Sequence, residues 1–244
     1  MDGNTAALVT GGSRGIGAAS ALRLAEDGVD VVITYVNDAE AAAEVVGKVE
    51  ALGRRAIAVR ADAADPAAAA LAVERTVHAF GRLDVLVNNA GVGVIGPLEG
   101  LGLAEVDRVL AVNVRAVFLT AQAAAATMRP GGRIITIGTC MTQRVPGPGG
   151  TLYAMSKSAL IGLTKALARE LGERGITANI VHPGPVDTDM NPADGPYAGP
   201  QAAMTALGRF GTAPEVAAVV SFLAGPEAGY VTGAEFAVDG GHAA

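Results

Sequence analysis

Tyr153 and Lys157 are the two side chains whose spacing most clearly predicts chemistry. They stand four residues apart in Tyr-Ala-Met-Ser-Lys, at the start of an expected long helix, so both lie on one helix face, one turn apart. A tyrosine hydroxyl, with an ordinary pKa of about 10, is a poor base at neutral pH. An ammonium one turn away favours the phenolate and lowers that pKa. The pair predicts acid–base chemistry, although the same spacing is also found on solvated helix faces.

A glycine-rich loop joins the first expected strand, 6–10, to the first expected helix, 16–27. It reads Thr-Gly-Gly-Ser-Arg-Gly-Ile-Gly over 10–17. Gly11, Gly15 and Gly17 allow a tight turn, close approach of the backbone to a phosphate, and close packing of helix on strand. The helix start directs its N-terminal amides and positive dipole end at the anion. The loop predicts a dinucleotide site, although its spacing differs from the commonest fingerprint and a glycine-rich turn without a ligand is the alternative.

The residues near the second expected strand favour NADP(H) over NAD(H). Where NAD-binding folds carry an acid for the ribose 2′-hydroxyl, this chain has Tyr35. Arg14, inside the glycine loop, can pair with a 2′-phosphate, and Asn37 can add a hydrogen bond. Asp38 argues the other way if its carboxylate turns inward. We therefore expect NADP(H) as the cofactor.

Further motifs follow the glycine loop in a fixed order. They are Asn88-Asn89-Ala90-Gly91, then Asn113, then the Tyr153/Lys157 pair, and then Pro183-Gly184. In this order and spacing, the sequence resembles the short-chain dehydrogenase/reductase family over essentially the whole chain. The segments 133–138, 159–171 and 239–241 are similar to the bacterial 3-oxoacyl-[acyl-carrier-protein] reductase type of that family.

The resemblance implies catalytic roles for the shared residues. Tyr153 would be the general acid/base that gives a proton to the substrate oxygen. Lys157 would hold the nicotinamide ribose and lower the pKa of Tyr153. Asn113 would keep a water chain connected to the lysine.

The resemblance also implies the cofactor contacts. Asp62 would meet the adenine amino group, which leaves Asp65 as the helix cap, and Val186 and Thr188 would meet the nicotinamide carboxamide. Asn88 is expected to hydrogen-bond across strands instead. The full set expected to contact the cofactor is Gly11, Ser13, Arg14, Gly15, Ile16, Gly17, Tyr35, Asn37, Asp62, Ala63, Asn89, Ala90, Gly91, Tyr153, Lys157, Pro183, Gly184, Val186 and Thr188.

The sequence departs from the family where a serine hydroxyl normally polarises the carbonyl. No serine lies between Ile137 and Tyr153. One alignment places Thr139 at the serine position, whereas the spacing common in the family places Cys140 there. We prefer Thr139, because a thiol is a poorer donor to a developing oxyanion. Cys140 is then a small apolar filler.

Short apolar runs alternate with helical patterns along the chain. Strands are expected at 6–10, 31–35, 56–60, 84–88, 133–137, 176–182 and 235–238, and helices at 16–27, 39–52, 66–80, 152–173 and 214–224. Continuous Val/Ile/Leu runs are typical of strands covered on both faces. The alternation predicts a single α/β domain over 1–244: a Rossmann-like, doubly wound parallel sheet with helices on both faces. The Pro/Gly-rich segment 187–208 is expected to be a substrate lid.

The composition limits which classes of protein this chain can belong to. The 244 residues are 50% hydrophobic and 17% charged, which excludes a disordered chain. The formal charge of −6 gives no general attraction to nucleic acid or an anionic membrane. A single cysteine suits a reducing cytoplasm, the N-terminus lacks a signal-peptide pattern, and no apolar run approaches the roughly 20 residues that span a bilayer. The histidines, His78, His182 and His242, show no metal-ligand spacing and are expected to be non-catalytic.

Together these features predict a cytoplasmic, NADPH-dependent carbonyl reductase that acts on a small ketone or 3-oxoacyl substrate. Two alternatives stay open: an alcohol dehydrogenase of specialised metabolism, and a cofactor-bound ligand sensor with low activity, which the absent serine motivates. Arginine is sparse near the expected substrate walls (Arg144 and Arg209), so a patch for an acidic carrier protein is not evident. The resemblance implies a homotetramer.

Overall fold

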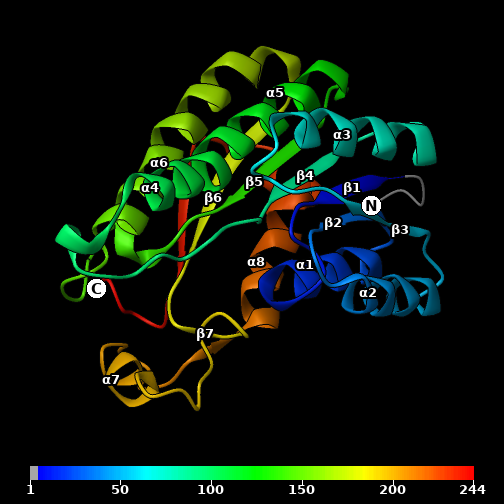
Figure 1. Ribbon diagram of the computed structural model, residues 1–244. Coiled ribbons are helices and arrows are strands. Elements are labelled where there is room, and N and C mark those ends of the chain that lie inside the picture. Colours follow the sequence, from blue (N-terminus) through cyan, green and yellow to red (C-terminus); the bar gives the residue numbers. More distant parts are fainter. Residues whose placement is uncertain (1–4) are drawn as a thin grey trace.

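A seven-stranded parallel sheet forms the centre of this computed structural model, which describes residues 5–244 (Figure 1). Its strands, in spatial order, are β3 (Ala56–Arg60), β2 (Asp30–Tyr35), β1 (Ala6–Val9), β4 (Val85–Asn88), β5 (Arg133–Ile137), β6 (Thr177–Pro183) and β9 (Glu235–Val238). The order reverses between β1 and β4, and a crevice for ligands opens at such a switch point. Residues 1–4, on which the signal-peptide prediction partly rests, lie outside the described range.

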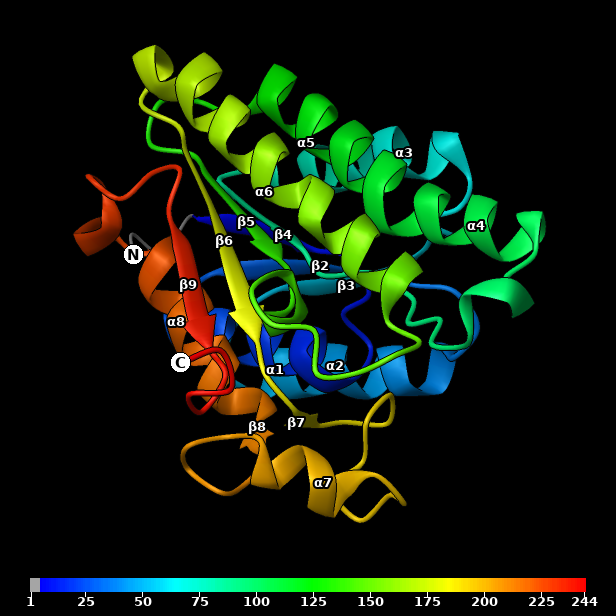
Figure 2. The same ribbon diagram turned by 90° about the vertical axis from the view of Figure 1, so that its left-hand side faces the viewer.

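Helices cover both faces of the sheet (Figures 1 and 2). One face carries α1 (Gly15–Glu26), α2 (Ala39–Ala51) and α8 (Ala213–Ala224), and the other carries α3 (Pro66–Phe80), α4 (Leu103–Leu110), α5 (Ala116–Thr127) and α6 (Thr151–Leu171). The predicted fold class is thereby confirmed. The predicted element boundaries differ from these by at most two residues, but α4 and α5 were not predicted as a pair of helices.

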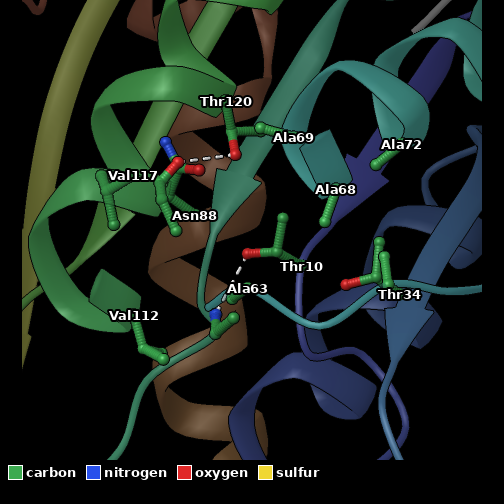
Figure 3. A pocket seen from close by; sticks show the side chains of 13 residues that line it. Thr10, Thr34, Ala63, Ala68, Ala69, Ala72, Asn88, Val112, Val117 and Thr120 are labelled. Atoms are coloured by element: carbon green, nitrogen blue, oxygen red, sulfur yellow. Dashed lines mark hydrogen bonds between the residues drawn. The ribbon is translucent and has the colours of Figure 1, made fainter. Parts of the chain in front are cut away.

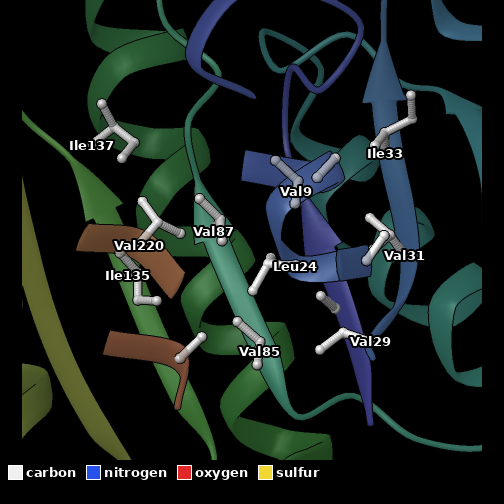
Figure 4. Packing of buried hydrophobic residues seen from close by; sticks show 14 of the residues in the cluster. Val9, Leu24, Val29, Val31, Ile33, Val85, Val87, Ile135, Ile137 and Val220 are labelled. Atoms are coloured by element: carbon white, nitrogen blue, oxygen red, sulfur yellow. The ribbon is translucent and has the colours of Figure 1, made fainter. Parts of the chain in front are cut away.

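The core on the α1/α8 face is built from the continuous apolar strand runs (Figure 4). Val9, Val87 and Ile135 lie on three neighbouring strands and are each 0% exposed, as are Leu24 of α1 and Val220 of α8. Burying a side chain of this size contributes about 1.5–3 kcal/mol. Because both faces are packed in this way, the strand ends and their loops are held rigidly enough to position a site.

One helical stretch corrects a sequence prediction. α4, the π-helical turn η2 (Ala111–Arg115) and α5 run on without a break, and Leu103–Thr127 is long and apolar enough, by length and composition, to cross a membrane. The sequence predicted no apolar run of that length, because the longest candidate, 116–128, contains Thr120, Gln122 and Thr127. In the fold this helix packs against α3 and α6 on one face of the sheet, as the core helix of a globular domain does.

The segment after β6 forms a small separate layer beyond the carboxyl edge of the sheet. Its two ends are joined by β7 (Val186–Asp187) and β8 (Gly211–Thr212), which pair in parallel, and α7 (Ala198–Ala203) lies between them. In Figure 2 the arrowheads of β6 and β9 point towards this layer. The predicted lid at 187–208 therefore has a fixed base and a short helix of its own, neither of which was predicted.

Candidate active site

Lys157 is buried at the centre of the carboxyl edge. It is 4% exposed, and its Nζ donates to the Ile137 carbonyl oxygen at 2.8 Å. Burial lowers the pKa of the Lys157 ammonium to about 8. Gly91 lies directly opposite, since a Cβ there would be 3.3 Å from Nζ and 3.4 Å from Asn113 Oδ1. The first turns of α6 and the end of β4 thus face one another across a gap that a side chain would fill.

Tyr153 lies half-buried one turn before Lys157, as the spacing predicts. Burial raises the pKa of its hydroxyl, and a hydrogen bond with the Thr139 side chain acts in the opposite direction. The sequence predicted that Lys157 would lower this pKa. In this structure the ammonium points to the Ile137 carbonyl and the hydroxyl is desolvated, so the lowering of the pKa by Lys157 together with a bound nicotinamide stays a prediction. The raised pKa keeps the proton on Tyr153, which is the form that donates.

Thr139 follows the end of β5 and is 7% exposed. Its Oγ1 accepts from Met141 N at 3.3 Å and caps the short 3-10 turn Cys140–Thr142. Its side chain also lowers the pKa values of the Tyr153 hydroxyl and the Cys140 thiol. Burial and the nearby Asp239 outweigh this for the thiol and raise its pKa to about 11. Of the two candidates for the serine position, Thr139 is therefore the one that lowers the pKa of the tyrosine hydroxyl, whereas Cys140 raises it.

Asn113 is fully buried in the π-helical turn η2. Its Oδ1 accepts from Val92 N and its Nδ2 donates to Val92 O, both at 2.9 Å. Nδ2 also donates to Ser156 Oγ at 3.0 Å, and that hydroxyl donates to the Tyr153 carbonyl at 2.8 Å. Asn113 therefore ties the loop after β4 to the start of α6. No motif in the sequence pointed to Ser156, which is an ordinary small residue inside a helix.

The glycine loop is held by side chains from neighbouring strands. Asn89 Nδ2 donates to the carbonyls of Thr10 at 3.0 Å and Gly11 at 2.9 Å. Thr10 Oγ1 accepts from the backbone amides of Asn89 and Ala90, both at 3.0 Å. A Cβ on Gly17 would collide with the Gly11 carbonyl oxygen and with Asn89 Nδ2. The Asn89 amide thus shapes the loop, whereas it was expected only to line the cofactor.

The end of α1 that faces the crevice carries no side-chain cap. Arg14 is its N-cap residue and makes no capping bond, in contrast to Asp38 on α2 and Asp65 on α3. Gly11 and Gly15 take positive φ values of 63° and 54°. Ser13 and Ile16 lie in the same turn and are half-buried. The first amides of α1 are therefore not capped by a side chain, and their use by a phosphate stays a prediction.

The edge beside β2 carries the residues expected to select the cofactor. Tyr35, the last residue of β2, is half-buried and Asn37 is exposed. Asp38 accepts from Ala41 N at 2.9 Å, so its carboxylate is used as a helix cap and does not turn inward. Arg14 is exposed and lies 3.6 Å from Asp189 of the lid segment, a pair open to solvent on both sides. An inward-turned Asp38 was the one argument from the sequence against NADP(H), and its use as a helix cap removes that argument.

The residues expected to meet the adenine follow β3. Asp65 accepts from Ala67 N at 2.9 Å and caps α3, as predicted. Asp62 is exposed and accepts from Ala64 N at 2.9 Å, with Ala63 half-buried beside it. This turn holds the Asp62 carboxylate at the surface of the crevice.

The opposite end is formed by the residues after β6. Gly184 N donates to Val238 O at 3.0 Å, and a Cβ on Gly184 would lie 2.6 Å from Asp239 Cα. Pro183 is the last residue of β6, and Val186 is buried in β7. Thr188 reaches the glycine loop, since a Cβ on Gly15 would be 3.3 Å from its Cγ2. Segments distant in the sequence therefore close on one crevice.

Asn88 corrects a prediction. Its backbone pairs with Thr136, but its side chain, 3% exposed, lies in a small cavity on the α3/α5 face, and Nδ2 has no hydrogen-bond partner among the described residues (Figure 3). The Thr120 hydroxyl beside it already donates to Ala116 O at 2.8 Å, and most other cavity walls are alanines. The predicted cross-strand bond through the side chain does not form.

Comparison with known proteins identifies the family. The model described as "Enoyl-(Acyl carrier protein) reductase" matches residues 11–243. A short-chain dehydrogenase from Burkholderia cenocepacia J2315, solved in complex with NADP, is 56% identical, with a TM-score of 0.98 over 99% of this chain and 98% of that one. This chain belongs to the short-chain dehydrogenase/reductase family. The resemblance inferred from the motifs is confirmed.

Two curated relatives of this short-chain dehydrogenase/reductase differ in their names. A "Cyclic-di-GMP-binding biofilm dispersal mediator protein" of Escherichia coli (strain K12) is 44% identical over 96% of this chain and 94% of its own length. A "3-oxoacyl-[acyl-carrier-protein] reductase" of Synechocystis sp. is 42% identical over 96% of this chain and 95% of its own. Family membership therefore leaves the substrate open. Among residues 5–244 no cluster of His, Cys, Asp and Glu could hold a metal ion.

Proposed function

We propose that this short-chain dehydrogenase/reductase is an NADPH-dependent carbonyl reductase with Tyr153 as the proton donor. The observation that carries the proposal is the placement of Thr139, Tyr153 and Lys157 together: the Thr139 side chain lowers the pKa of the Tyr153 hydroxyl against the effect of burial, and Lys157 is buried one turn away. The three groups lie on the same sheet edge as the glycine loop. If this helix face only contacted solvent, the Lys157 ammonium would be exposed and not buried.

The crevice fits a nicotinamide dinucleotide. Gly11, Gly15 and Gly91 each leave space that a Cβ would fill, and the N-terminus of α1 offers uncapped amides to a pyrophosphate. The Burkholderia relative was solved with NADP. The residues that would hold the group are those of the glycine loop, with Asp62, Ala63 and the backbone of 89–91 on one side and Pro183, Gly184, Val186 and Thr188 on the other. When bound, the group supplies the hydride.

The side chains of this protein would bind and protonate the substrate oxygen. The Thr139 and Tyr153 hydroxyls both donate to the carbonyl oxygen and stabilise the charge that develops there. Tyr153 then transfers its proton to that oxygen, which makes the alcohol. Lys157 supplies a positive charge near the phenolate that remains, and its ammonium, bonded to the Ile137 carbonyl, would also hold the ribose of a bound cofactor. Asn113 holds the loop and helix that frame this gap.

Arg14 is expected to select NADPH through the 2′-phosphate. Its pair with Asp189 is exposed and worth at most about 1 kcal/mol, so a phosphate dianion can displace the carboxylate. Arg14→Ala should lower the ratio of kcat/KM for NADPH to that for NADH by about 10–100-fold, the effect of losing a charged hydrogen bond. Steady-state kinetics with both cofactors measure this ratio. Asp189→Asn is the matched control and should leave the ratio unchanged or raise it; an unchanged ratio in Arg14→Ala would assign the selection to other residues.

The substrate is proposed to be a neutral ketone with an apolar group beside the carbonyl. Ile95, Val145, Met190 and Leu207 are exposed hydrophobic residues on the loops around the site, being 62%, 51%, 64% and 65% exposed. Ile95, on the loop after β4, was not among the walls predicted from the sequence. Large apolar side chains exposed together mark a binding surface.

The nearby arginines do not offer a patch for an acidic carrier. Arg144 donates to the His242 carbonyl at 2.9 Å, and Arg209 is paired with Glu215 at 2.6 Å. This favours a free small molecule over an acyl carrier protein as the substrate.

NADPH oxidation by the purified protein tests the proposal. The panel holds neutral aliphatic and aromatic ketones, β-ketoacyl thioesters and carboxylated ketones, with secondary alcohols and NADP⁺ assayed in reverse. Turnover that prefers neutral apolar ketones supports the proposal. Turnover confined to alcohol oxidation would favour the dehydrogenase alternative, and tight NADPH binding with no turnover would overturn the reductase.

The pH dependence should follow Lys157. Its pKa is lowered to about 8, so the ammonium is present below that pH and lost above it. Since kcat/KM reports ionisations of the free enzyme, kcat/KM for NADPH should be constant below pH 8 and fall as the pH rises further. Lys157→Arg keeps its charge throughout and should show no decline between pH 8 and 9.5. A flat profile in the wild-type protein would contradict the assigned role of the ammonium.

A second candidate is a nucleotide-binding regulator. It is favoured by the name of the Escherichia coli relative and by threonine in place of the usual serine. Isothermal titration with cyclic-di-GMP, with and without NADPH, tests it. Micromolar binding with no ketone turnover would favour this candidate over the reductase.

We also propose a cytoplasmic homotetramer. Exposed apolar side chains on the helices of the α4/α5/α6 face support it, namely Leu110, Phe118 and Met155. The family relation to a bacterial 3-oxoacyl reductase supports the compartment.

A further inference from the structure

His182 makes contacts that the proposed chemistry does not yet use. It lies on β6, is 0% exposed, and its Nδ1 accepts a hydrogen bond from the backbone amide of Thr139 at 3.2 Å. The ring lies against Gly138, where a Cβ would be 2.5 Å from Nδ1. The Thr142 hydroxyl is 3.4 Å from the same nitrogen but donates to the Thr139 carbonyl at 2.9 Å. The backbone amide of Thr139 is thus the group that donates a hydrogen bond to Nδ1.

The contacts of the other ring nitrogen fix the protonation state of the ring. Because Nδ1 accepts, the proton of a neutral imidazole is on Nε2. Nε2 lies 3.3 Å from Glu235 Oε2 on β9, and Glu235 Oε1 is 2.8 Å from Lys165 Nζ on α6. Burial lowers the pKa of His182, which keeps the ring neutral and Nδ1 free to accept. Lys165, Glu235 and His182 form a chain of bonds that ends at the Thr139 peptide.

The end of β5 is therefore held from two sides. Lys157 binds the Ile137 carbonyl, and His182 binds the amide of the peptide between Gly138 and Thr139. Two anchored peptides restrict the orientation of the Thr139 backbone, and with it the side chain that lowers the pKa of Tyr153. Displacing a reacting group by about 1 Å can cost 10²-fold in rate.

We propose that His182 is a positioning residue, which fixes the Thr139 peptide so that the Thr139 hydroxyl meets the substrate carbonyl. The inference rests on the proposed function, since it assigns His182 to the hydroxyl that binds the ketone oxygen. His182 touches neither the substrate nor the cofactor. It acts through Thr139 alone.

Two substitutions separate the roles of the two ring nitrogens. In His182→Asn the side-chain oxygen replaces Nδ1 and can still accept from the Thr139 amide. In His182→Gln the amide group reaches the Nε2 position, serves Glu235 and leaves the Thr139 amide unpaired. His182→Gln should lower kcat by about 10–100-fold, and His182→Asn should keep most of it. KM for NADPH should be unchanged in both, because the cofactor loop is not touched.

Two further measurements exclude a general structural effect. In a Thr139→Ala background, His182→Gln should cause almost no additional loss of kcat, because the residues act as one unit. Hydrogen exchange of the Thr139 amide should be fast in His182→Gln and slow in His182→Asn and the wild type. His78→Gln, a histidine change on α3, is the control and should change nothing. If His182→Gln does not fold, Glu235→Ala replaces it, since losing the Nε2 acceptor frees the ring and should lower kcat in the same direction.

The outcomes separate this inference from the proposed function. If no ketone is reduced by the wild-type protein, the reductase proposal fails, while amide exchange still decides whether His182 holds the Thr139 peptide. If ketones are reduced but His182→Gln and His182→Asn have the same kcat, or the two losses are additive in the double variant, the inference is overturned.

Discussion

Replacing Tyr153 with phenylalanine should lower kcat for ketone reduction by about 10²–10⁴-fold, the contribution of a positioned general acid. The substitution removes only the hydroxyl oxygen and leaves the ring in its half-buried place on α6. NADPH affinity should be unaffected, because the glycine loop and Lys157 keep their contacts. Stopped-flow kinetics at saturating NADPH measure the loss, and quenching or enhancement of NADPH fluorescence measures the affinity.

Tyr230→Phe is the matched control. It removes the same hydroxyl oxygen from a tyrosine that is fully exposed. It should retain wild-type kcat. If Tyr153→Phe keeps more than a tenth of the activity, a water or another group donates the proton, and the central assignment fails.

Replacing Thr139 with alanine should lower kcat by about 10²–10³-fold, the scale for one lost oxyanion donor. Thr139 is 7% exposed and its side chain lowers the pKa of Tyr153, so the substitution removes a donor and also this effect on the tyrosine. Thr139→Ser keeps the hydroxyl and removes a methyl group that stiffens χ1. We expect this variant to match or exceed the wild-type kcat, measured in the same assay.

Cys140→Ala separates the two alignments of the missing serine. It should change kcat by less than about threefold, since a thiol is a weak donor and burial raises the pKa of this thiol to about 11. A loss below about threefold in Thr139→Ala, with a large loss in Cys140→Ala, would move the role to the cysteine.

The sequence by itself determined the elements of the sheet and the local parts of the site. The Val/Ile/Leu runs and the helical patterns between them depend on periodicity over a few residues, and the strands formed where these runs predicted them. Tyr153 and Lys157 share a face because a helix turns every 3.6 residues. The glycine loop is equally local, since Gly11 and Gly15 are needed for their own positive φ values.

The apolar stretch around α4 and α5 is a helix that local sequence patterns did not predict. Charged residues divide it in the sequence, and only packing against α3 and α6 makes Leu103–Thr127 one continuous helix. The lid is a second case, because β7 and β8 are two residues each and exist only through their pairing with one another.

The tertiary structure decided the electrostatics of the site. Lys157 was predicted to lower the pKa of Tyr153, yet its ammonium bonds a carbonyl twenty residues away on β5, and burial raises the pKa of the tyrosine. Asp38 was ambiguous until the fold used it as a helix cap. His182 and Thr139 meet across 43 residues. Burial and bonding partners arise only when distant segments pack together, so the spacing of residues can propose which groups react, but their protonation states and orientations are set by the fold.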